Sequence, residues 1–148
     1  MESEGGGYVS RLLHLDTNAL IALADPEGGV VQLVRERVQS GMLPAASAVA
    51  WHEFVRGPLM PDELLRVERV IGARIQPVSR STSELAARLF NATGRRRAST
   101  ADCFIAAGAI EQDTELLTAD GDDFKLFASL GLKLVAARNP QASMRRKE

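Results

Sequence analysis

The chain has 148 residues, of which 45% are hydrophobic and 25% charged, with a formal net charge of −1 at pH 7. This is ordinary for one soluble globular domain and argues against a broadly cationic nucleic-acid binder, although a local basic groove stays compatible with it. Cys103 is the only cysteine, which excludes an intramolecular disulfide and a cysteine-based zinc site. Because no apolar run reaches the roughly 20 residues of a membrane span and no secretory signal pattern is visible, we expect a cytoplasmic protein without membrane contact.

Apolar runs alternate with helical patterns along the chain, which predicts a parallel α/β sandwich. Residues 1–8 are typical of a flexible lead-in and residues 139–148 of a polar tail, so we expect a single domain at residues 9–138. Strands are expected at residues 12–15, 42–46, 75–78, 116–118 and 132–135, and helices at 19–24, 30–38, 48–55, 61–71, 81–93, 101–111 and 124–130.

Local signals indicate where these elements begin and end. Thr17 or Asn18 is expected to cap the first helix, and Ser81 with Glu84 three residues later has the pattern of a capping box. Pro44 weakens the second expected strand, because proline cannot donate a hydrogen bond to a strand ladder.

Acidic residues follow two of the expected strands. Asp16 ends the first strand, and Asp120 and Asp123 follow the fourth. The carboxyl ends of parallel strands share one edge of a sheet, which is also where open α/β sheets bind ligands. Asp102 lies in the first turn of a helix that begins at the same edge, and Glu53 lies on a mostly apolar helix, an unusual place for an unpaired carboxylate. These side chains could therefore converge.

A cluster of carboxylates needs a neutralising partner. At about 6 Å and an effective dielectric near 20, each pair of carboxylates repels by roughly 2–3 kcal/mol, enough to raise a pKa by about two units. Hard divalent cations with oxygen ligands, Mg²⁺ or Mn²⁺, are the obvious candidates. Such ions activate water and stabilise the charge that develops on a phosphodiester during displacement.

Each acidic group also has a structural interpretation. Asp16 and its two polar neighbours could form only a turn with a helix cap, and Asp102 could simply complement a helix dipole. Glu53 could pair with Arg56, and the segment 120–123 could be a solvated turn. The spacing of the residues leaves the structural and the functional interpretation equally open.

Four segments in order resemble a known family. They are Leu13–Asn18; Ser47 with Glu53, Phe54 and Gly57; Ala101–Ala107; and Leu116–Phe124. Together they make the chain, from about Leu12 to Val135, similar to PIN-domain ribonucleases, and specifically to the VapC-type toxins of bacterial type II toxin–antitoxin pairs. The resemblance implies a three-layer α/β/α fold with a small central parallel sheet.

The resemblance also implies a metal-dependent endoribonuclease that hydrolyses RNA with a metal-activated water. Asp16, Glu53 and Asp102 match the three acidic positions that bind Mg²⁺ or Mn²⁺ and catalyse the reaction. The fourth falls within 120–123, where we favour Asp120 as a catalytic metal ligand, with Asp123 as a further candidate ligand.

Other residues receive supporting or open roles. Thr17, Asn18 and Thr118 look like residues that orient the carboxylates and water. Arg95, Arg96 and Arg97 could contact RNA phosphates, or could equally be a solvated loop. His14, Trp51 and Cys103 fit packing roles better than chemical ones.

The resemblance implies partners as well: an RNA substrate, a cognate antitoxin protein that blocks the acidic cleft, and a second copy in a homodimer. Two other functions fit part of the pattern. An aspartyl-phosphate-type phosphatase is disfavoured because Asn18 replaces the aspartate expected two residues after Asp16 and no suitable lysine follows a later strand. A non-catalytic PIN-like module that binds RNA or protein is disfavoured by the four acidic positions. The RNA target and the number of metal ions stay open.

Overall fold

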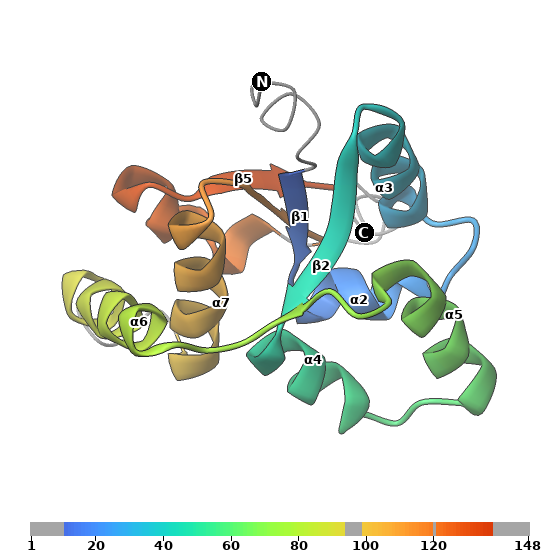
Figure 1. The fold of residues 1–148 in the computed structure, drawn as a ribbon, viewed down its shortest axis with the longest axis horizontal. Coiled ribbons are helices and arrows are strands. Elements are labelled where there is room, and N and C mark those ends of the chain that lie inside the picture. Colours follow the sequence, from blue (N-terminus) through green and yellow to red (C-terminus); the bar gives the residue numbers. More distant parts are fainter. Residues whose placement is uncertain (1–10, 94–98, 120, 138–148) are drawn as a thin grey trace, which may run out of the picture.

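A five-stranded parallel sheet organises the computed structural model, which describes residues 11–93, 99–119 and 121–137 (Figure 1). The strand order is β3-β2-β1-β4-β5, so β1 lies in the centre and pairs with β2 and β4. The crossovers run from β1 outward to β3, and then from β3 back across to β4. The strands are β1 (Arg11–Leu15), β2 (Met42–Ser47), β3 (Ile75–Gln76), β4 (Glu115–Thr118) and β5 (Lys133–Ala136).

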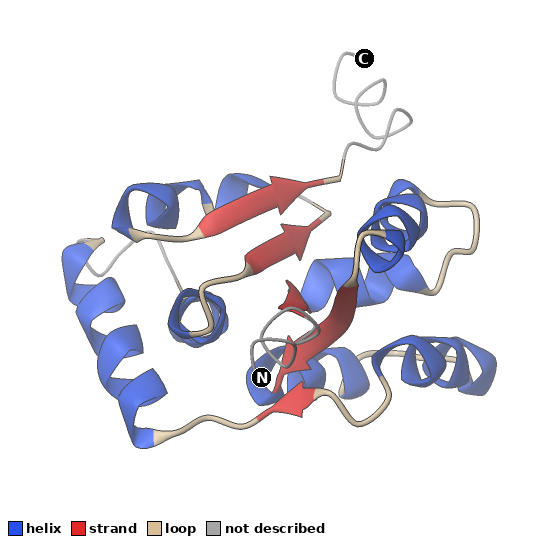
Figure 2. Ribbon diagram, turned by 45° about the horizontal axis from the view of Figure 1, so that its top comes forward, coloured by secondary structure: helices blue, strands red, loops and turns tan. Residues whose placement is uncertain are grey.

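Helices cover both faces of this sheet. Figures 1 and 2 show α6 and α7 on one side and α2, α3 and α5 on the other, with α4 at the end where β2 finishes. The expected three-layer α/β/α architecture is confirmed. The helices are α2 (Thr17–Leu23), α3 (Gly29–Gln39), α4 (Ala48–Val55), α5 (Pro61–Ile71), α6 (Arg80–Ala92) and α7 (Thr100–Glu111), and two 3₁₀ segments, η1 (Gly121–Asp123) and η2 (Lys125–Leu130), precede β5. No helix in these described ranges is both long and apolar enough to cross a membrane.

The central strand is buried on both faces. Leu13 and Leu15 are at most 1% exposed, as expected for a strand covered by helices on either side. His14 is fully buried between them, and its Nε2 lies 2.7 Å from Oε1 of Gln112 at the end of α7. The middle of α7 is made of small residues, and Gly108 faces the His14 ring closely. The packing role expected for His14 is confirmed, because its contacts with Gly108 and Gln112 hold α7 against the sheet.

Two of the expected helix starts are wrong. Asp16, rather than Thr17 or Asn18, caps α2, because its side chain accepts from the backbone N–H of Ala19. In α6 the cap is Ser79, whose hydroxyl accepts from the N–H of Thr82, so the capping box lies two residues earlier than expected.

The last part of the fold differs from the pattern in detail. The expected helix at 124–130 is instead the 3₁₀ segment η2, and the third strand has two residues rather than four. Pro44 is tolerated within β2 because its missing N–H faces the β3 side, where the pairing begins only at Ala46; its carbonyl on that side accepts from Arg74 Nε at 2.7 Å.

Candidate functional site

Asp16 occupies the junction between the central strand and α2. Its backbone N–H donates to the carbonyl of Leu117 in β4 at 3.1 Å, which extends the strand ladder by one residue. Its carboxylate then accepts the 2.7 Å bond that begins α2. Because the strand ladder and the helix both hold this residue, the carboxylate is fixed at the carboxyl edge of the sheet.

The same residue is almost fully buried, at 2% exposure. Burial raises the pKa of Asp16 to about 6, and the nearby charges of Asp102 and Asp123 add to the rise. Hydrogen bonds from the Thr118 hydroxyl and the Ala19 N–H act in the opposite direction but are weaker. The fold therefore holds an acid at this edge that is costly to ionise without a counter-charge.

Glu53 reaches the same place from α4. Its Oε1 accepts a 2.6 Å hydrogen bond from the hydroxyl of Thr17, the first residue of α2. Its Oε2 is 3.7 Å from Nη2 of Arg56, so the ion pair that the sequence left open does form, although it is long. The contact with Thr17 links α2 to α4 and orients the carboxylate.

Asp102 lies in the first turn of α7, where its backbone N–H donates to the Ser99 hydroxyl at 3.0 Å. Burial raises the pKa of Asp102, hydrogen bonding from Ser99 lowers it, and repulsion from Asp123 and Glu53 raises it further. The helix dipole alone would favour the charged form. Asp102 is therefore more than a dipole partner, since burial and neighbouring acids prevail.

These side chains line one cleft of about 190 Å³. The structure thus brings together Asp16, Glu53, Asp102 and Asp123, as their positions predicted. Asp120 and the three arginines 95–97 lie outside the described residues, as do the lead-in 1–8 and the tail 139–148. The complete described lining is Asp16, Thr17, Asn18, Glu53, Asp102, Ile105, Asp123 and Phe124.

Two lining residues were missed by the sequence reasoning. Ile105 lies one helical turn after Asp102, and Phe124 directly follows Asp123. The available signal was their spacing from the acids, because a residue three positions along a helix shares its face. They add apolar side chains to the lining of the acidic cleft.

The donor set suits a hard divalent cation. Within the described residues, no three acidic, histidine or cysteine side chains are already arranged closely enough to hold an ion. Mg²⁺ does not require this, because it commonly keeps several waters and uses one or two carboxylates together with substrate phosphates. A buried aspartate with a raised pKa, facing other carboxylates, is compatible with that mode of binding.

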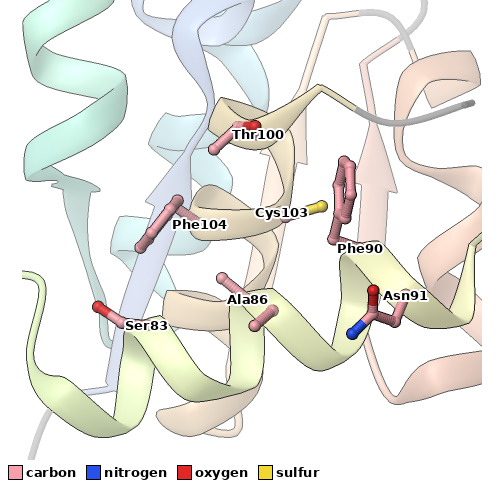
Figure 3. A pocket seen from close by; sticks show the side chains of 8 residues that line it. Ser83, Ala86, Phe90, Asn91, Thr100, Cys103 and Phe104 are labelled. Atoms are coloured by element: carbon pink, nitrogen blue, oxygen red, sulfur yellow. The ribbon is translucent and has the colours of Figure 1, made fainter. Parts of the chain in front are cut away.

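A second cavity, between α6 and α7, has a different character (Figure 3). It measures about 260 Å³ and is mostly apolar. In Figure 3 the sulfur of Cys103 on α7 points toward Phe90 of α6, and both residues line the cavity, which agrees with the packing role expected for the cysteine. The lining is Ser83, Ala86, Ala87, Phe90, Asn91, Thr100, Cys103 and Phe104, so none of the four carboxylates borders it.

Fold and cleft together define an α/β protein with a candidate divalent-metal site at the carboxyl edge of its sheet. A family model described as the PIN domain matches residues 13–130. The chain belongs to the PIN domain family. A comparison with curated proteins gave no match.

Solved structures of similar fold include three from bacteria. A chain of the VapBC2 complex of Rickettsia felis, bound to a DNA fragment from its promoter, is 15% identical with a TM-score of 0.69; the match covers 86% of this chain and 99% of that one. A chain of the VapBC-5 toxin–antitoxin system of Mycobacterium tuberculosis is 24% identical with a TM-score of 0.59, and the match covers 85% of this chain and 98% of that one. VapC20 of the same organism, described as a toxin that cleaves the sarcin–ricin loop, is 16% identical with a TM-score of 0.54, and the match covers 81% of this chain and 95% of that one. At these identities the likeness establishes the fold.

Proposed function

We propose that the protein is a Mg²⁺- or Mn²⁺-dependent endoribonuclease and the toxin component of a type II toxin–antitoxin pair. The observation that carries the proposal is the single cleft lined by Asp16, Glu53, Asp102 and Asp123. The charge of this cleft calls for a cation, and membership of the PIN domain family favours nuclease chemistry.

In this proposal the metal, when bound, activates the attacking water and offsets charge on the phosphodiester. Asp16, Glu53 and Asp102 would hold it, with Asp120 as the favoured fourth ligand and Asp123 as a further candidate ligand. Thr118 fixes the Asp16 carboxylate and Thr17 fixes Glu53, while Asn18 borders the cleft. Arg95, Arg96 and Arg97 remain candidates for RNA contacts.

Partners are proposed on the same basis. The similar folds include chains of toxin–antitoxin complexes, which supports a cognate antitoxin, and one toxin described as cleaving an RNA loop, which supports RNA as substrate. An antitoxin that covers the cleft with a basic side chain would replace the cation charge there. A homodimer is expected as well.

The experiment is a cleavage assay with bacterial total RNA. The wild type should cut RNA with Mg²⁺ or Mn²⁺, should stop in EDTA, and should recover when the metal is added back. Asp16→Asn should be inactive under every condition, although it keeps the cap of α2, since asparagine caps helices as well as aspartate does. Equal cleavage by wild type and Asp16→Asn would exclude the proposal. RNA binding without any cleavage would favour the non-catalytic module.

A further inference from the structure

Arg56 is the C-cap residue of α4, one turn beyond Glu53 on the same helix. Its Nη2 is 3.7 Å from Oε2 of Glu53, which is beyond hydrogen-bond range, and its side chain is 64% exposed. The other oxygen of Glu53 is occupied by the 2.6 Å bond from Thr17. Thr17 thus fixes Glu53, whereas the guanidinium of Arg56 is held loosely and faces solvent.

RNA entering the cleft brings negative charge toward four carboxylates. The described lining contains neither lysine nor arginine. Among the described ion pairs, only the pair of Arg56 with Glu53 joins a cationic side chain to a residue that lines this cleft. Lys125, which is close to the cleft residues in sequence, pairs with Asp122 instead. Arg56 is therefore well placed to lower the repulsion that a phosphate meets at the cleft.

We propose that Arg56 contacts an RNA backbone phosphate beside the one being cleaved, exchanging Glu53 for that phosphate when substrate binds. The inference rests on the proposed ribonuclease function and adds how the substrate backbone is held. A guanidinium offers five N–H donors in a fork that matches phosphate oxygens. The present pair is long and exposed, so it contributes little and is readily given up.

A charge-matched set of variants tests the assignment. Arg56→Gln removes the cation, Arg56→Lys keeps it, and Arg80→Gln removes an equal charge from an exposed pair on α6, where Arg80 Nε is 3.0 Å from Glu84. The substrate is a fluorescein-labelled pool of random-sequence single-stranded RNA. Cleavage with Mg²⁺ yields KM and kcat, and fluorescence anisotropy against KCl concentration, in an Asp102→Asn background that leaves RNA uncut, yields the salt dependence of binding.

We expect Arg56→Gln to raise KM about tenfold and to change kcat by less than about twofold. The slope of log affinity against log salt should fall in magnitude by about 0.7, the value for one lost phosphate contact on a single strand. Arg56→Lys should keep that slope, and Arg80→Gln should match the wild type. Thermal unfolding of each variant verifies that the fold is intact.

The outcomes separate this inference from the function on which it rests. If the wild type cleaves RNA and Arg56→Gln keeps its KM and salt slope, the inference is wrong and the ribonuclease function stands. A loss confined to kcat would assign Arg56 to the orientation of Glu53 and contradict the phosphate contact. An equal change in Arg80→Gln would mean that general surface charge is responsible. Failure of the wild type to cleave with either metal would remove both proposals.

Discussion

Carboxylates at the two edges of the sheet lie in opposite electrostatic surroundings. At the amino edge, where β4 and β5 begin, Glu115 lies 2.8 Å from Arg37 Nε and Asp113 lies 2.8 Å from Lys133 Nζ. Lys133 lowers the pKa of Asp113. At the carboxyl edge, burial raises the pKa of both Asp16 and Asp102, and the repulsion of neighbouring acids adds to it.

Both edges are hollow and both carry acids, so neither feature separates them. The cavity at the amino edge is larger, about 290 Å³ against about 190 Å³, and cations stand beside its acids. Its lining is Arg11, Arg37, Ser40, Met42, Asp113, Thr114, Glu115 and Lys133. The candidate site differs because its described lining contains no cationic side chain to compensate its carboxylates. Such uncompensated charge lowers the stability of the fold, so a functional role explains its presence better than a structural one.

The largest expected effect is on cleavage by the matched pair Asp102→Asn and Asp113→Asn. Each removes one carboxylate, but from opposite edges. We expect Asp102→Asn to lower kcat by at least about 1000-fold, equal to about 4 kcal/mol of transition-state stabilisation, because a proposed metal ligand is lost. Asp113→Asn should stay within about twofold, since its positive φ of 52° is one that asparagine tolerates. Steady-state kinetics with Mg²⁺ measure both, and similar losses in the two variants would erase the distinction between the edges.

Asp16→Asn should stabilise the metal-free protein. The pKa of Asp16 rises from 3.8 to about 6 in the fold. Above both values the unfolded chain therefore gains more from ionisation, and stability falls as pH rises from about 4 to about 6. At 1.36 kcal/mol per pKa unit this cost reaches about 3 kcal/mol at neutral pH. The variant cannot ionise, so its advantage should be largest near neutrality and vanish below about pH 4.

Urea unfolding across that pH range, with EDTA present, measures the difference between wild type and Asp16→Asn. The matched variant Asp113→Asn should show the opposite sign. The pKa of Asp113 is lowered, so its ionised form stabilises the fold above the ordinary value and that contribution disappears in acid. A gain for Asp16→Asn that does not depend on pH would mean that repacking, not relief of charge, is responsible.

Much of this edge could be predicted from the sequence. Short apolar runs that end in polar residues located β1 and β4, and the rule that parallel strands end at one edge placed Asp16 beside the segment after β4. Asp102 could be placed because a helix that follows a crossover begins at the same edge. These inferences rest on periodicity and topology, which the sequence records directly.

The rest depended on competition between nearby side chains. Ser79, rather than Ser81, caps α6 by accepting from the N–H of Thr82, so Glu84 lies inside the helix, where it pairs with Arg80 at 3.0 Å. Thr17 or Asn18 was expected to cap α2, yet Asp16 does so, which leaves the hydroxyl of Thr17 available for Glu53. Which side chain caps a helix, and which hydroxyl binds Glu53, depends on contacts between different helices and strands. Neither residue spacing nor helix propensity predicts those contacts.

Thr17→Val tests the link between α2 and α4 at an intermediate size of effect. Valine keeps the shape but loses the hydroxyl that donates to Glu53 at 2.6 Å. Groups that hydrogen-bond a metal ligand commonly contribute 10–100-fold to metal affinity or activity, so we expect a loss of about that size. A titration of cleavage rate with Mg²⁺ should show that higher metal concentrations restore part of it.

Thr17→Ser is the control, because it retains the hydroxyl and should stay close to the wild type. If valine at this position stays close to the wild type while serine is impaired, the methyl group of Thr17 matters and the hydrogen bond to Glu53 does not. In that case Glu53 would be oriented by Arg56 rather than by α2.

The smallest expected effect is at the amino edge, where Glu115→Gln should change stability but not cleavage. The substitution leaves Arg37, only 28% exposed, without its carboxylate partner. A half-buried, hydrogen-bonded pair of this kind contributes about 1 kcal/mol, more than a fully exposed one. Glu84→Gln removes the carboxylate of an exposed pair, 92% and 56% exposed, and should lower the unfolding free energy less. Urea unfolding at low and at about 1 M salt measures both, and screening should shrink the Glu115 effect only in part.

An equal or larger loss for Glu84→Gln would mean that burial does not set the strength of these pairs. The charge compensation at the amino edge would then be incidental, and the contrast with the acidic cleft would rest on the carboxyl edge alone.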